Sequence, residues 1–92
     1  MLARCPASRR SDLVLRHFAD GSVMYDEASG GLHALSPVAG LVMGELLAND
    51  ELTPEVLASR LQLDDPSAQE LEQIELMLRE LESLGFVDCQ TP

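Results

Sequence analysis

The pattern of apolar residues changes once along this chain, at Ser36-Pro37, and that change constrains the fold more than any other feature. Before it, apolar residues fall in short β-type runs separated by glycines. After it, they recur at helical spacing, as Val38, Val42 and Leu46 do. Because 92 residues supply one hydrophobic core, we expect a single α+β domain whose sheet precedes its helices.

Three strands are predicted before the change. Residues 13–19 and 22–28 are joined at Asp20-Gly21, a dipeptide that favours the tight turn of a hairpin. A third, short strand over residues 32–35 follows a Ser-Gly-Gly turn, whose glycines allow the chain to reverse. We therefore expect an antiparallel meander with the first and third strands at its edges.

Three helices are predicted after the change, and each begins at a capping residue. Ser36-Pro37 opens a helix to about residue 49, and Thr53-Pro54 opens a short one to about residue 61. The third helix begins either at Asp65-Pro66 or at a capping box over residues 67–70, and Gly85 ends it. The order β-β-β-α-α-α is winged-helix-like.

The first eleven residues show no periodicity and carry three of the six arginines, Arg4, Arg9 and Arg10. This composition predicts a flexible N-terminal arm over residues 1–11, followed by a single winged-helix domain over residues 12–92.

The chain is strongly acidic: it has six arginines and sixteen Asp and Glu residues, which gives a net charge of −10. Such a chain repels nucleic acid and anionic lipid, so we expect no nucleic-acid or membrane partner and favour a basic or neutral one.

Cys5 and Cys89 lie at opposite ends without metal-ligand spacing, and no apolar run reaches the length of a membrane span. We expect free thiols and a cytoplasmic location.

Three segments in this order resemble the PqqD-like family. Residues 23–39, with the sequence VMYDEASGGLHALSPVA, are similar to its tyrosine-ended strand, Ser/Thr-Gly turn, His-x-Leu strand and following helix. Residues 52–58 (LTPEVLA) and 81–87 (LESLGFV) are similar to its second helix and to its Leu-x-x-Leu-Gly ending. The resemblance covers about residues 13–88, and the His33 segment looks closest to the subgroup of the HPr-rel-A system.

The resemblance implies a recognition element for ribosomally made, modified peptides. Such a domain binds the leader segment of a precursor peptide along its third strand and third helix, and presents it to a partner modifying enzyme. It implies a peptide chaperone of natural product biosynthesis that is not an enzyme and uses no cofactor or metal. The chain departs from the founding proteins of pyrroloquinoline quinone synthesis in detail, which leaves its own pathway open.

The residues themselves allow a similar mechanism. A third strand at the sheet edge offers unpaired N–H and C=O groups to an extended peptide. From the residues alone the favoured interpretation is a solvated edge, or one covered by the arm or by the Phe86-Val87 tail, and the family resemblance reverses that order. The candidate peptide-binding residues are Leu32, His33, Ala34, Leu35, Gln73, Leu76, Met77, Glu80 and Leu84.

The helical candidates follow from the wheel of the third helix. Ile74, Leu78 and Leu81 centre its apolar face, and Gln73, Met77, Glu80 and Leu84 lie on one shoulder. Leu76 falls almost opposite the core. Met77 and Leu84 also suit plain core packing, and an exposed Leu76 is ordinary for a surface.

The two histidines are not expected to be catalytic or to bind metal. His17 and His33 lie on separate predicted strands without a nearby Cys or Ser to activate, and His33 is expected to pack beside Tyr25.

Two other functions stay open. One is an interaction subunit that docks on an HPr-kinase-like protein, and the other is a winged-helix nucleic-acid binder. A homodimer is also left open.

Overall fold

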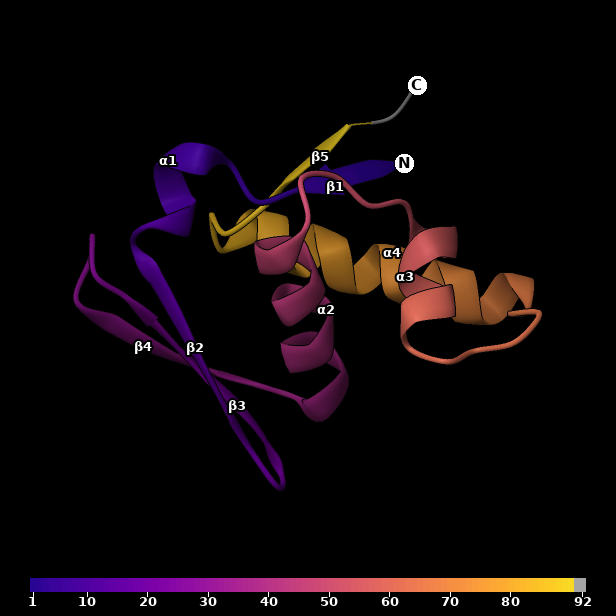
Figure 1. Cartoon of the computed structure of the whole chain (residues 1–92), viewed down its shortest axis with the longest axis horizontal. Helices are drawn as coiled ribbons and strands as arrows, with labels where there is room; N and C mark the ends of the chain where they lie inside the picture. The colour runs from indigo at the N-terminus through magenta and orange to yellow at the C-terminus, as the bar shows by residue number, and fades with distance from the viewer. Residues whose placement is uncertain (91–92) are drawn as a thin grey trace.

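The computed structural model describes residues 1–90 and has the expected three-stranded antiparallel sheet. Its strands are β2 (Leu13–Phe18), β3 (Gly21–Asp26) and β4 (Gly31–Leu35), in the order β2-β3-β4 (Figure 1). Gly21 has a φ of 152°, which permits the tight turn between β2 and β3. The α+β class and the meander with β2 and β4 at its edges are confirmed.

Three helices follow the sheet: α2 (Pro37–Ala48), α3 (Pro54–Arg60) and α4 (Ala68–Ser83). The side chains of Ser36 and Thr53 cap α2 and α3 by accepting a backbone N–H from the first turn. Of the two predicted starts of the third helix, the later one is correct, because Ser67 and Glu70 form a reciprocal capping box.

The ends of the chain differ from the prediction of a flexible arm. Strand β1 (Leu2–Arg4) pairs antiparallel with β5 (Asp88–Gln90), and a short helix α1 (Ala7–Arg10) follows β1. Ala3 and Cys5 are buried in the same core as the helices. The physical reason is non-local: Ala3 exchanges two backbone hydrogen bonds with Leu52, of 2.8 and 2.9 Å, which no local pattern in the first eleven residues reveals.

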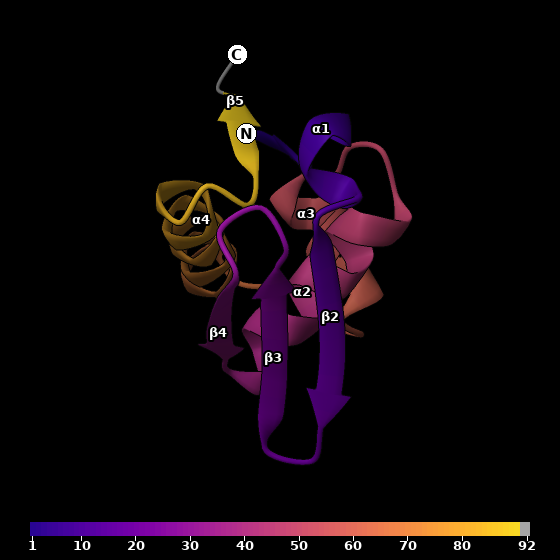
Figure 2. The same cartoon turned by 90° about the vertical axis from the view of Figure 1, so that its left-hand side faces the viewer.

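The core lies between the sheet and the helices and is mostly aliphatic. Met24 of β3, Met43 of α2 and Leu78 of α4 are fully buried, and so is Phe86, which directly follows the turn after α4. Helix α2 packs on the inner face of the sheet, mainly against β3 (Figure 2). This packing leaves the other face of the sheet toward solvent and places α4 on the same side of the molecule as β4.

Two glycines of α2 face the sheet, and Gly40 lies much closer to it than Gly44 does. A Cβ atom at Gly40 would overlap the hydroxyl of Ser22, which is buried and bonded to His17. At Gly44 the nearest atom, the Nε2 of His17, would lie 3.6 Å away, an ordinary van der Waals contact. The close approach of α2 to β3 therefore requires a glycine at position 40 only.

We expect Gly40→Ala to lower the free energy of unfolding by about 1–3 kcal/mol, because the methyl group overpacks the helix against β3. Gly44→Ala, the matched control, should leave stability unchanged or raise it by up to about 1 kcal/mol through better helix propensity. Urea unfolding followed by circular dichroism measures both. Equal stability of the two variants would contradict the observed helix–strand packing.

Candidate functional site

The site begins with the outer edge of β4. Within residues 1–90, β4 pairs with β3 alone. The C-terminal strand β5 does not cover this edge, because it pairs with β1 in a separate two-stranded sheet (Figure 1). The N–H and C=O groups along one side of β4 are therefore available to another extended chain.

The four candidate residues of β4 point alternately to the two faces of the sheet. Leu32 and Ala34 are exposed on the outer face, where Leu32 leaves 71% of its surface accessible. His33 and Leu35 are half-buried on the inner face. The four residues therefore all offer their backbone to the site, but their side chains lie on two different surfaces of the sheet.

The expected contact of His33 with Tyr25 is wrong. The ring of His33 meets Phe86 edge-on, with 4.9 Å between the ring centroids and 83° between the planes. The register explains the difference: Tyr25 is opposite Leu32 on the outer face, whereas His33 is opposite Met24 on the inner face. This contact joins β4 to the segment that follows α4.

Helix α4 supplies the other side of the site. Ile74, Leu78 and Leu81 are buried as the helical wheel predicts. Gln73 and Met77 line a cavity on the flank of the helix. The remaining candidates on α4 are the exposed Leu76 (59%), Glu80 and Leu84 (49%). By helical geometry Glu80 and Leu84 share the flank with Gln73 and Met77, whereas Leu76 points away from the core.

The cavity beside Gln73 and Met77 has a volume of about 280 Å³. Its other lining residues are Val38, Leu61, Leu63, Glu70 and Ile74, which come from the start of α2, the link after α3 and the first half of α4. Val38 lies only three residues beyond the end of β4. An extended chain that follows β4 toward α2 would therefore meet this largely apolar cavity, with Glu70 as its one acidic group.

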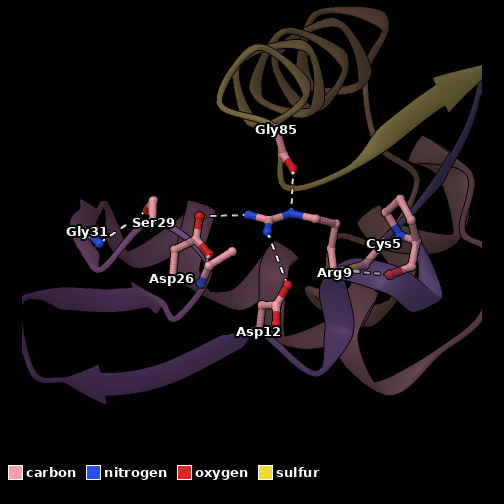
Figure 3. A network of polar contacts seen from close by, with 9 residues as sticks. Cys5, Arg9, Asp12, Asp26, Ser29, Gly31 and Gly85 are labelled. Atoms are coloured by element: carbon pink, nitrogen blue, oxygen red, sulfur yellow. Dashed lines mark hydrogen bonds and ion pairs between the residues drawn. The ribbon is translucent and has the colours of Figure 1, made fainter.

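A network around Arg9 connects the elements that border the site (Figure 3). Its guanidinium donates to the Asp26 carboxylate at 2.7 Å and to the Gly85 carbonyl at 3.1 Å, and its contact with Asp12 is 3.4 Å. Asp26 ends β3 opposite Gly31, the first residue of β4, and Gly85 follows α4. One side chain thus ties the end of β3 to the turn after α4.

The neighbouring Arg10 is also structural. It donates to the backbone carbonyls of Cys5, Leu47 and Asn49, and so holds α1 against the end of α2. Sequence reasoning placed both arginines in a flexible arm and missed this role. The local signal, three arginines within the first ten residues, is one that an exposed arm would share.

One polar pair lies beneath α2. The expectation that no serine lies near His17 is wrong: its Nδ1 is 2.8 Å from the hydroxyl of Ser22, the residue opposite His17 in the β2–β3 hairpin. Ser22 is only 5% exposed, under Gly40 of α2. The buried Ser22 hydroxyl thus has a hydrogen-bond partner in the exposed His17 and lies where α2 contacts β3.

The ion pair between Arg9 and Asp26 makes stability depend on pH. The hydrogen bond from Arg9 holds the pKa of Asp26 below its usual value, and burial opposes this shift. A carboxyl whose pKa is lowered in the folded state stabilises the fold above its unfolded pKa, about 3.9. That contribution is lost as the pH falls through the lower, folded pKa.

We therefore expect Asp26→Asn to lower the unfolding midpoint at pH 7 and to lose less of its stability than the wild type as the pH falls below about 4. Asp20→Asn in the β2–β3 turn is the control, since Asn-Gly and Asp-Gly suit the same turn. Thermal unfolding across pH 2–7 measures this. If the unfolding midpoint of Asp26→Asn lay below that of the wild type by the same amount at every pH, the ion pair would have no such effect.

Neither a protein-family model nor a curated protein matches this sequence. Two solved structures share its fold. TbiB1, solved in complex with the TbiA(beta) leader peptide, has a TM-score of 0.70 and 14% identity, over 97% of this chain and 99% of TbiB1. A lasso peptide synthetase B1 complexed with its leader peptide has a TM-score of 0.66 and 19% identity, over 95% and 98%. This chain therefore has, over nearly its whole length, the fold of proteins that were solved with a leader peptide bound.

Proposed function

We propose that this protein is a recognition element that binds the leader segment of a ribosomally made precursor peptide and presents it to a modifying enzyme. The observation that carries the proposal is the open edge of β4 on the side of α4. The fold shared with two leader-bound proteins and the resemblance to the PqqD-like family support the same function.

The binding mode is β-strand addition. The peptide pairs with the backbone of β4 (Gly31–Leu35) and extends the three-stranded sheet by one strand. Each main-chain hydrogen bond contributes a net ~0.5–1.5 kcal/mol, so a few of them reach only modest affinity. The rest comes from side chains of the peptide that reach the cavity on the flank of α4, which Val38, Gln73 and Met77 border.

Selectivity then comes from the flank of α4. The cavity bordered by Val38, Ile74 and Met77 suits an apolar side chain of the peptide, and the flexible methionine adapts to its shape. Glu70 at this cavity and Glu80 further along favour basic residues elsewhere in the peptide. The full set of residues that we assign to the peptide is Leu32, His33, Ala34, Leu35, Gln73, Leu76, Met77, Glu80 and Leu84.

We propose that the protein itself is not an enzyme, and that its partners are the precursor peptide and a separate modifying enzyme. The His17–Ser22 pair does not argue for catalysis, because Ser22 is buried under α2. Since precursor peptides are made on ribosomes, the proposed location is the cytoplasm. None of the helices within residues 1–90 is long and apolar enough to cross a membrane.

Titration with the leader peptide encoded nearest to this chain should shift the NMR signals of residues 31–35 and of Gln73, Met77 and Glu80. Calorimetry should give a dissociation constant that rises with salt, because the acidic flank of α4 attracts a basic peptide. A scrambled peptide of the same composition is the control. Shifts confined to α3, or equal binding of the scrambled peptide, would contradict the proposal.

Strand addition makes a second prediction about the peptide backbone. An added strand directs alternate N–H groups toward β4, so two peptides N-methylated at alternate residues should behave differently. The frame that faces β4 should lose about twofold to tenfold in affinity per bond removed, and the other frame should lose little. Equal losses in both frames would exclude pairing of the peptide with the sheet edge.

A further inference from the structure

The outer face of the sheet lies on the side opposite α2 (Figure 2) and carries several exposed apolar side chains. The register places Val14, Tyr25 and Leu32 side by side in one row across the three strands. The next row holds Arg16, Val23 and Ala34, and Phe18 lies beyond it at the end of β2. We call these seven residues the outer sheet face.

This face is unusually apolar for a surface toward solvent. Antiparallel sheets with one solvated face normally alternate apolar residues inward with polar residues outward. Here Phe18 leaves 60% of its surface exposed and Leu32 leaves 71%. A depression of about 190 Å³ lies among these side chains. Clustered exposed apolar groups of this kind mark a surface that another molecule covers.

Arg16 indicates which chemical groups the molecule that covers this face must carry. It is the only charged residue of the outer sheet face, lies in the middle of β2, and makes no ion pair within residues 1–90. The rest of the chain is acidic, with a net charge of −10. A surface that complements this face is therefore apolar and carries a carboxylate that reaches Arg16.

A second copy of the chain fits the face poorly. Two copies that pair through it about a two-fold axis would bring Arg16 toward its own counterpart, because such an interface uses the same patch on both subunits. Each copy also carries ten net negative charges, which oppose self-association. Both features favour a different protein as the occupant.

We propose that the outer sheet face docks the modifying enzyme, through an apolar surface of that enzyme with an acidic residue opposite Arg16. The inference rests on the proposed function and adds where the enzyme sits. Leu32 is part of both the outer sheet face and β4, so the enzyme surface and the bound peptide adjoin. A peptide held on the edge of β4 is thereby delivered next to the enzyme.

The test uses Arg16→Glu and Phe18→Ser, because β2 is the edge strand farthest from the peptide edge. The control is Val56→Ser, an exposed apolar residue of α3. Biolayer interferometry with the purified modifying enzyme encoded beside this chain should show a loss of about tenfold or more for both β2 variants and none for the control. Urea unfolding confirms that each variant is folded.

Calorimetry with the leader peptide separates this inference from the proposed function. We expect all variants to bind the peptide with affinity within about twofold of wild type, since the β4 edge is unchanged. Enzyme affinity that is unaffected by both β2 variants overturns the docking surface and leaves peptide recognition standing. Wild-type protein that binds the enzyme but not the peptide overturns the proposed function instead. A concentration-dependent dimer that Phe18→Ser abolishes, measured by sedimentation, would assign the face to a second copy and also overturn the inference.

Discussion

The pairing of the two ends of the chain determines what the rest of the molecule can do. Because β1 and β5 satisfy one another in a small separate sheet, the C-terminal strand does not fold onto the edge of β4. The backbone of β4 keeps one unsatisfied side on the same side of the molecule as α4. An exposed strand edge is a hazard for aggregation in most proteins. A short edge of five residues in a strongly acidic chain limits that hazard and keeps the edge usable.

The polar contacts of α1 give this arrangement its geometry. Arg9 links the end of β3 to the turn after α4, and Arg10 links α1 to the end of α2. The end of β3 and the turn after α4 are thus connected through the N-terminal segment. The edge-on contact of the His33 ring with Phe86 adds a connection between β4 itself and the segment after α4. The contacts between the sheet and the end of α4 therefore involve three separate parts of the sequence: the N-terminal segment, strands β3 and β4, and the segment after α4.

Local signals were sufficient for much of the fold. Asp20-Gly21, Ser36-Pro37 and the capping box at Ser67 each act within a few residues, and the turn and the helix starts lie where they predict. Non-local features were not accessible in this way. The burial of Ala3 depends on Leu52 and β5, and the direction of His33 depends on a register that a one-residue shift would reverse. The assignment of Gln73 and Met77 to one flank of α4 follows from helical periodicity, but their shared cavity requires the positions of Val38 and Leu63.

The central claim is that an incoming peptide becomes the fourth strand of the sheet, and NOE spectroscopy of the complex tests it most directly. With isotope-labelled protein and unlabelled leader peptide, the account predicts intermolecular NOEs between backbone protons of the peptide and those of Gly31–Leu35, in the alternating pattern of a β ladder. The peptide side chains should show NOEs to Met77. A bound peptide that shows NOEs to α2 or α3 and none to the backbone of β4 would contradict the account.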